Sequence, residues 1–357
     1  MTFDDHSFSG ERFVTDDILF ERRGDAGCVL LNRPKALNAL THDMARALAA
    51  QLTEWESDPS VRHVVIKGAG DKAFCAGGDI RNLYEARQAG QTAGLSDFFY
   101  DEYRLNAQIK AYSKPYIALI DGIVMGGGVG VSVHGSHRVG TEYMLFSMPE
   151  TGIGFFPDVG GTYFLPRMPK ATGIYCALSA GRLKQADAFA TGVLTHAVSR
   201  DRLADLEAAL ETAEEIDAVL ADFHNDPGPA PLMDKADVIE RAFGQASVAE
   251  IMEDLDQDGG DWAAKTAAAI RAKSPTSVHV AFEQMRRGAE LDFAGCMRLE
   301  FRIVNEILKG HDFFEGIRAV LIDRDNAPVW QPDRLDQVDS AALDAYFQTP
   351  DCGDLPL

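Results

Sequence analysis

Two glycine-rich segments, about twenty residues apart, most constrain how this chain can fold. The first, 125–130, follows an apolar run at 116–120 that predicts a strand, and it opens into 129–133, which predicts a short buried helix. Glycines at such a junction allow a backbone N–H to approach a ligand closely, and the start of a helix favours negative charge. We therefore expect a ligand site at this strand-to-helix turn.

The second segment, 148–161, sets two carboxylates, Glu150 and Asp158, among glycine and apolar residues. An acid in a loop can simply be solvated, but a carboxylate in apolar surroundings tends to have a raised pKa, which suits an acid, a base or a nucleophile. Together with N–H donors for an oxyanion, a carboxylate pair predicts acyl chemistry.

An earlier stretch repeats the order of strand, glycine loop and helix. A predicted strand at 61–67 is followed by a loop at 68–79 and by a helix from Ile80. Gly78 and Gly127 are then the natural backbone donors to one shared oxygen, although two tight turns in an α/β core would give the same pattern. Neither loop has the spacing of a dinucleotide fold or of a phosphate-binding P-loop, which argues against a nucleotide cofactor bound by those routes.

The charge balance restricts the class of partner. Of the 357 residues, 46% are hydrophobic, which is typical of a globular protein. The net charge of −21 is unfavourable for non-specific binding to nucleic acid or to an anionic membrane surface. An anionic ligand would need a local basic patch, for which Arg33, Lys35 and Arg81 are candidates.

Other catalytic and metal sites find little support. His134 and His137 have no acid partner at metal-ligand spacing, so we interpret them as structural and expect no metal. Ser132 and Ser147 lack the surroundings of a hydrolase nucleophile elbow. Cys75 lies in a helix-entry loop, but a small buried residue is the simpler interpretation.

Cysteine usage and the N-terminus predict a cytoplasmic protein. The five cysteines are scattered, odd in number and without a CxxC pair, which favours free thiols in a reducing compartment. Residues 1–12 resemble neither a signal peptide nor an Arg-rich presequence, and no apolar run is long enough to span a bilayer.

The pattern along the chain predicts one large core followed by a mostly helical region. The charged stretch 201–223 predicts one helix, and 310–321 mixes charge and aromatic residues so densely that it should pack against something specific. The expected units are an N-terminal tail (1–16), an α/β core (17–223), a proline-rich linker (224–234), a helical C-terminal region (235–328) that covers the site, and a polar, mostly solvated tail (329–357).

Several of these motifs resemble the crotonase (enoyl-CoA hydratase/isomerase) superfamily. The resemblance rests on residues 74–80, 125–128 and 149–150. Longer stretches resemble the members that hydrolyse short 3-hydroxyacyl-CoA thioesters, 3-hydroxyisobutyryl-CoA above all: 32–38, 126–135, 149–161, 163–167 and 310–316. The likeness covers residues 17 to 335.

The resemblance implies an α/β fold in which ββα repeats form a spiral, with a helical C-terminal region that either trimerises or folds back over the site. It implies a small-molecule acyl-CoA substrate from valine degradation (branched-chain amino acid catabolism). Coenzyme A would be part of the substrate, with no metal and no other cofactor. The protein would be a homo-oligomer (trimer or hexamer) or a monomer.

The resemblance also assigns residues. The thioester carbonyl would lie between the N–H groups of Gly78 and Gly127. Glu150 would be the catalytic acid/base or nucleophile, and Asp158 the second carboxylate. Glu102, which the residues alone suggest is a solvated helix acid, would contact the substrate. The CoA moiety would be bordered by Ala36, Leu37 and Ala76.

One position departs from the hydratases of this superfamily. They carry a second catalytic glutamate two residues after the glycine run, where this chain has Gly130, so hydrolysis is the leading hypothesis. Enoyl-CoA hydration or isomerisation is the alternative. A non-catalytic binding protein of the same fold, a class in which some members engage RNA, is the third hypothesis. Whether Glu150 attacks the carbonyl or activates water is open at this point.

Overall fold

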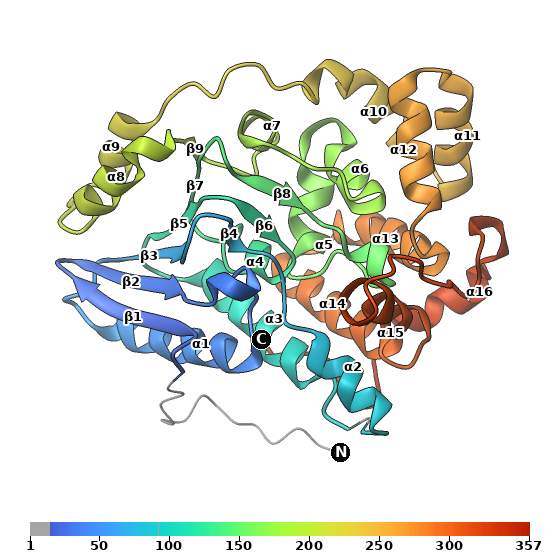
Figure 1. The fold of residues 1–357 in the computed structure, drawn as a ribbon, viewed down its shortest axis with the longest axis horizontal. Coiled ribbons are helices and arrows are strands. Elements are labelled where there is room, and N and C mark those ends of the chain that lie inside the picture. Colours follow the sequence, from blue (N-terminus) through green and yellow to red (C-terminus); the bar gives the residue numbers. More distant parts are fainter. Residues whose placement is uncertain (1–14, 92) are drawn as a thin grey trace.

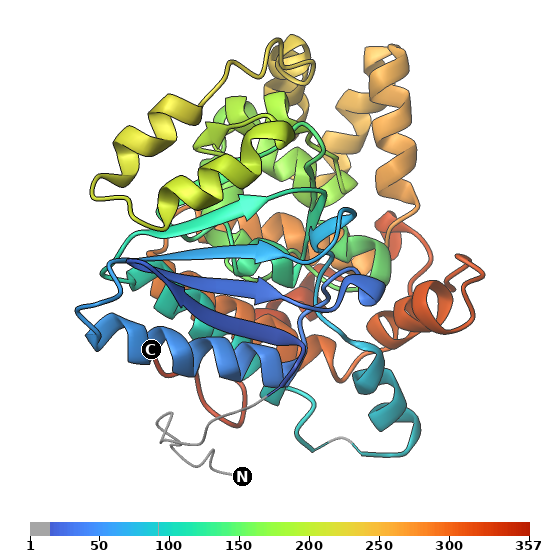
Figure 2. The same ribbon diagram turned by 60° about the vertical axis from the view of Figure 1, so that its left-hand side comes forward.

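The computed structural model describes residues 15–91 and 93–357 (Figures 1 and 2). Nearly all of the expected tail 1–16, and with it the expectation about targeting, lies outside these residues. Within them, no helix is both long and apolar enough to cross a bilayer.

Two sheets form the frame of the core. The strand order in the larger sheet is β1-β2-β3-β5-β7-β9. Strands β1 (Ile18–Arg23) and β2 (Ala26–Leu31) form an antiparallel hairpin, and every later neighbour in the order pairs in parallel. The smaller is parallel, in the order β4-β6-β8. The remaining strands are β3 (His63–Gly68), β4 (Ala73–Cys75), β5 (Tyr116–Ile120), β6 (Ile123–Met125), β7 (His137–Gly140), β8 (Leu145–Ser147) and β9 (His196–Ala197).

Each turn of the chain contributes one strand to each sheet, as the pairs β3/β4, β5/β6 and β7/β8 show. This is the expected spiral of ββα repeats. Its helices pack on the large sheet and on one another, with α1 (His42–Ser57) beside α3 (Asp97–Ala111). Thr41 caps α1 as predicted, because its hydroxyl accepts the N–H of Met44.

Two predicted helices differ from those observed. The buried helix expected at 129–133 is α4 (Gly127–Gly130), and 131–134 form turns. Glycines are poor helix formers, and the Ser132 hydroxyl donates to the carbonyl of Gly128. The helix expected over 201–223 is broken into α8 (Leu203–Leu210) and α9 (Ile216–Phe223), because the chain turns after α8 and the Glu211 carbonyl accepts the N–H of Asp25 in the β1–β2 turn.

The C-terminal region folds back onto the spiral of its own chain. Helix α14 (Phe293–Ile307) packs against α3 and α5 (Gly161–Phe164), and α13 (Pro275–Gly288) packs against α5 and α6 (Thr172–Ser179). Buried residues of both regions belong to one hydrophobic cluster. The other helices are α2 (Arg81–Gln88), α7 (Gln185–Ala190), α10 (Ala236–Phe243), α11 (Val248–Asp258), α12 (Asp261–Arg271), α15 (Asp312–Ile317) and α16 (Ser340–Leu343).

The tail 329–357 is mostly exposed, as its composition predicts, but it is anchored at several points. Trp330, Phe347 and Leu355 are buried. Arg302 on α14 donates two hydrogen bonds of 2.6 Å to the carboxylate of Asp354. A few apolar side chains and one bidentate ion pair are therefore enough to dock a polar segment.

Candidate active site

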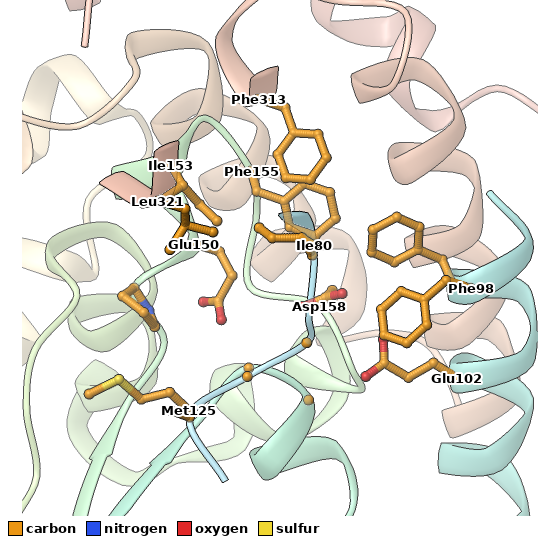
Figure 3. Close-up of a pocket in the computed structure, with 17 residues that line it drawn as sticks. Ile80, Phe98, Glu102, Met125, Glu150, Ile153, Phe155, Asp158, Phe313 and Leu321 are labelled. Atoms are coloured by element: carbon orange, nitrogen blue, oxygen red, sulfur yellow. The ribbon is translucent and has the colours of Figure 1, made fainter. Parts of the chain in front are cut away.

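One pocket lies where the glycine loops of the spiral meet the C-terminal region (Figure 3). The carboxyl groups of Glu150 and Glu102 point into it from opposite sides. Most of the lining is apolar or glycine, including Phe313 and Leu321 from the C-terminal region. A pocket of this kind, apolar with a few convergent polar groups, is typical of a small-molecule site.

Two backbone N–H groups face this pocket from adjacent turns. Gly78 follows β4, and Gly127 begins α4 after β6. A Cβ placed on Gly127 would lie 3.3 Å from the nitrogen of Gly78, so the two segments are in close contact. Within the described chain neither N–H donates a hydrogen bond. The two glycines predicted as donors to one ligand oxygen thus lie together in the lining of one pocket, and their role as donors remains a prediction.

The glycines around this pair are required by close packing. A Cβ on Gly128 would lie 2.2 Å from the carbonyl oxygen of Cys75, which no real side chain tolerates. Gly126 has φ 46°, in the region that favours glycine. The glycine run thus lets the start of α4 approach the end of β4 and bring the two donors together.

Glu150 is the first residue of a short 3-10 helix, Glu150–Ile153, just after β8. Its side chain is 5% exposed, and Oε2 has no hydrogen-bond partner among the described residues. Burial raises the pKa of Glu150 well above its usual value, and the charge of Asp158 adds to this, while Lys273 opposes it. A raised pKa favours the neutral form at rest and makes the ionised form a stronger base, which suits acid, base and nucleophile roles.

Asp158 lies eight residues further along the same glycine-rich loop and is also 5% exposed. The hydroxyl of Tyr103 donates a hydrogen bond of 2.9 Å to Asp158 Oδ2. Burial raises the pKa of Asp158 to about 7, although the bond from Tyr103 stabilises the charged form and lowers it. Asp158 therefore divides between its protonated and ionised forms at neutral pH.

Glu102 is buried on α3 rather than solvated, which corrects the interpretation based on the residues alone. Its Oε1 would lie 2.7 Å from a Cβ on Gly127, and it has no hydrogen-bond partner in the described part of the chain. Burial, followed by the charges of Asp158, Glu300 and Glu150, raises the pKa of Glu102 well above its usual value. The protonated form, which can donate a hydrogen bond to a substrate oxygen, is favoured.

Ala76 also lines the pocket, whereas Ala36 and Leu37 are not among its lining residues. The carbonyl of Leu37 accepts the N–H of Ala76, so this loop runs along the pocket's edge. The basic candidates are only partly available to a ligand. Arg33 binds Asp79 at 2.9 Å, and Arg81 donates to the carbonyl of Leu321, while Lys35 is exposed.

Two polar residues near the site were missed from the sequence. Tyr103 is the partner of Asp158, and Glu300 on α14 accepts the N–H groups of Gly160 and Thr162. No local pattern marks Tyr103. The sequence does contain a signal for Glu300. It falls on the same helical face as Met297, Val304 and other apolar residues, where an acid is unusual.

His134 and Cys75, interpreted from the sequence as structural, are buried as that interpretation requires, whereas His137 is only half-buried and lies 2.9 Å from Asp217. His134 is buried against Val159, with 2.6 Å between Nε2 and the carbonyl oxygen, and burial lowers its pKa to about 4. Burial raises the pKa of Cys75 to about 12, which disfavours a thiolate nucleophile. All five cysteines are free.

Comparison with known proteins places this site in a family. A family model described as enoyl-CoA hydratase/isomerase matches residues 26–347. The chain belongs to the enoyl-CoA hydratase/isomerase family. Solved structures agree on the fold: a carnitinyl-CoA dehydratase from Mycobacterium thermoresistibile has a TM-score of 0.90 and 41% identity, covering 95% of this chain and 98% of its own. An enoyl-CoA hydratase from Rhodobacter sphaeroides also has a TM-score of 0.90, at 36% identity, covering 96% of this chain and all of its own.

Curated relatives in the enoyl-CoA hydratase/isomerase family carry a hydrolase name. The protein named 3-hydroxyisobutyryl-CoA hydrolase, mitochondrial, of Danio rerio is 46% identical over 351 residues, which cover 96% of this chain and 92% of that protein. Its namesake in Homo sapiens is 44% identical over 352 residues, with 96% and 91% covered. The crotonase-like spiral predicted from the motifs is therefore confirmed. These relatives also carry the name of the hydrolases that the longer motifs resemble.

Proposed function

We propose that this protein is an acyl-CoA thioesterase that hydrolyses 3-hydroxyisobutyryl-CoA to the free hydroxy acid and CoA. The observation that carries the proposal is a pair of unoccupied N–H donors, Gly78 and Gly127, surrounded by three buried carboxyls in an apolar pocket. The hydrolase name of relatives at about 45% identity supports the choice of thioester.

In this reaction the thioester oxygen accepts the N–H groups of Gly78 and Gly127. As the carbonyl carbon is attacked, negative charge moves onto this oxygen, and donors already in place stabilise it. Removing one such donor typically slows an enzyme roughly 10²–10³-fold. The thiolate of CoA then leaves and takes up a proton.

Glu150, in its ionised form, supplies the attack. It either adds to the carbonyl carbon, giving a mixed anhydride that water then hydrolyses, or removes a proton from the water that adds directly. In both routes one water is consumed, and the products are a carboxylic acid and a thiol. Asp158 orients this water or the substrate hydroxyl, and neutral Glu102 donates to the hydroxyl of the acyl group.

The setting of the reaction extends the proposal. A 3-hydroxyisobutyryl thioester would place the protein in valine degradation, with no metal or cofactor besides the CoA of the substrate. The cytoplasmic location remains a prediction, since the relatives above are named as mitochondrial. The oligomeric state, monomer or homo-oligomer, and the division of the chain into the units given above remain predictions as well.

Enoyl-CoA hydration is the second candidate, because the two solved structures above are titled as a dehydratase and a hydratase. The surroundings of Gly130 argue against it. A Cβ at this position would lie 2.7 Å from Asn106 Nδ2 and 2.8 Å from Val159 Cβ, which leaves no room for the second glutamate of the hydratases. A non-catalytic RNA-binding role has less support, given the net charge of −21.

One assay separates the candidates. The purified protein is offered 3-hydroxyisobutyryl-CoA, 3-hydroxypropionyl-CoA and crotonyl-CoA in parallel, with thiol release followed by a trapping dye and enoyl loss by ultraviolet absorbance. Fast thiol release from the hydroxyacyl thioesters with unchanged crotonyl-CoA is expected. Enoyl loss without thiol release would instead identify a hydratase.

Substitution of Glu150 tests the assigned residue. Glu150→Gln keeps the shape and removes the charge, so turnover should be abolished while CoA binding, measured by calorimetry, survives. Glu290→Gln, at an exposed position on the surface, is the matched control and should turn over normally. Turnover retained by Glu150→Gln would overturn the assignment.

A further inference from the structure

Two buried polar side chains of the C-terminal region form hydrogen bonds to the loop that carries Asp158. Glu300 on α14 accepts the N–H of Gly160 at 2.8 Å through one carboxyl oxygen and that of Thr162 at 2.9 Å through the other. Gln284 on α13 donates from Nε2 to the carbonyl of Pro157 and to the Thr162 hydroxyl, both at 2.6 Å.

Both side chains are fully buried, at 0% exposure. A buried carboxylate is costly unless its oxygens are satisfied by hydrogen bonds or an opposite charge. Glu300 lies beside buried Phe301 and one helical turn from Met297 and Val304, where an apolar residue would pack without that cost. The bonds to the loop are therefore the structural reason for a carboxyl at this position.

The loop itself needs outside support. Val159 has φ 50° and Gly160 has φ 86°, so two consecutive residues are left-handed directly after Asp158. For a β-branched residue this conformation is uncommon and strained, and it persists only where the surroundings hold it. His134 contacts the Val159 carbonyl, while Glu300 and Gln284 hold the residues on either side.

We propose that Glu300 and Gln284 are positioning residues that clamp loop 157–162, so that Asp158 faces the substrate in the geometry the reaction needs. The proposal rests on the proposed function, because Asp158 is a reacting group only there. The structure thereby gives the C-terminal region a second task besides covering the pocket, namely to fix a catalytic loop of the spiral.

The clamp lies among several other titratable groups. The groups that face Glu300 are Asp158 and Glu150 from the loop segment, Glu102 and Tyr103 from α3, and Cys296 on α14 itself. Burial and the charge of Asp158 raise the pKa of Glu300 to about 8, so its carboxyl is largely neutral at the pH where Asp158, with a pKa of about 7, titrates. Glu300 and Gln284 therefore act on the loop through their hydrogen bonds rather than through a charge.

Two isosteric substitutions test the clamp. Glu300→Gln puts an amide NH₂ against a backbone N–H, and Gln284→Glu removes the amide NH₂ that donates to both the Pro157 carbonyl and the Thr162 hydroxyl, so each weakens the clamp. We expect kcat for the thioester to fall roughly 10- to 100-fold in both, as small misplacements of reacting groups do. KM should change less than about threefold, since neither residue lines the pocket.

The division of the loss between kcat and KM, measured on folded protein, distinguishes positioning of Asp158 from a general loss of structure. Both variants should keep the circular dichroism spectrum of the wild type and its KM while kcat falls, whereas a disrupted pocket would raise KM. Glu306→Gln, on the outer face of α14 beside Lys309, is the control and should change neither kcat nor KM. Unchanged kcat in both folded variants would overturn the proposal.

Hydrogen exchange provides a readout that does not depend on activity. In the wild-type protein the amides of Gly160 and Thr162 should exchange slowly, and they should exchange faster in either variant. Fast exchange in the wild type would overturn the clamp even if neither variant folds. If the wild type releases no thiol but exchange behaves as expected, the proposed function fails while the clamp on the loop stands.

Discussion

Tyr103 donates its hydroxyl hydrogen to Asp158 Oδ2 across 2.9 Å, and both side chains are buried. Tyr103 belongs to α3 and Asp158 to the loop before α5, so the bond joins two parts of the spiral that are 55 residues apart. It is a hydrogen bond that favours the ionised form of Asp158 in a setting where burial favours the neutral form.

The first prediction removes this bond. In Tyr103→Phe the ionised form of Asp158 loses a donor worth about 1.5–3 kcal/mol, so the pKa of Asp158 should rise further, by about one to two units. The Asp158 limb of the kcat/KM profile should move upward by the same amount. Tyr112→Phe, which loses a bond to the Leu52 carbonyl away from the pocket, is the control. An unmoved limb in Tyr103→Phe would contradict the role of this bond.

The second prediction concerns stability. Burial raises the pKa of Asp158 from 3.8 to about 7 and that of Glu300 from 4.5 to about 8. Because the folded state binds these protons more tightly than the unfolded state, the stability they give is fully present below about pH 4 and is lost progressively as the pH rises from there through 7 and 8. The free energy of unfolding should therefore fall by a few kcal/mol between about pH 4 and pH 8.

Chemical denaturation at a series of pH values measures this slope. The double variant Asp158→Asn, Glu300→Gln should show a flatter dependence than the wild type, since neither amide titrates. Asp336→Asn, at an exposed position paired with Arg334, is the control. Equal slopes in the wild type and the double variant would mean that other groups control the pH dependence.

The third prediction places the hydratase glutamate in this chain. Gly130→Glu should lower the stability by about 1–3 kcal/mol, because the new side chain collides with Asn106 and Val159 in a packed interior. It should not create hydration of crotonyl-CoA. Thermal unfolding and the enoyl absorbance assay test the two parts, with Gly310→Glu at an exposed position as the control. Efficient hydration by Gly130→Glu would show that a single residue separates the two activities.

The fourth prediction concerns the acyl group. Leu321, in the π-helix Arg318–Ile322, lines the pocket from the C-terminal side. In Leu321→Ala the space gained should favour thioesters one or two carbons longer, changing the ratio of kcat/KM values by roughly tenfold. Ile322→Ala, next in the chain but not among the lining residues, is the control. An unchanged ratio would exclude Leu321 from acyl selection.

The sequence predicted the parts of the fold that local patterns determine. Helix α6 and strand β5 begin and end where their apolar patterns do, and α1 begins at its Thr41 cap. The break between α8 and α9 was missed because its cause is distant: the β1–β2 turn docks on Glu211. Helix α4 differs from the prediction because glycines form helices poorly and because the Ser132 hydroxyl donates to the carbonyl of Gly128.

The residues of the candidate site also fall into those that a local pattern predicts and those that it does not. Glu150, Asp158 and the glycine pair were found because each lies in a segment whose composition is unusual in itself. Glu102 required the family resemblance, since one acid on a polar helix carries no local signal. Tyr103 and Glu300 could not be assigned a partner, because hydrogen bonds to residues 55 and about 140 positions away leave no trace in spacing.

Phe313 and Leu321 give the pocket a wall that comes from a different part of the chain than its N–H donors. Under the proposed function, the carboxylates that react and the side chains that contact the acyl group thus come from different segments of the chain. A relative with the same carboxylates and a different segment at 312–322 would be expected to keep the reaction and exchange the substrate.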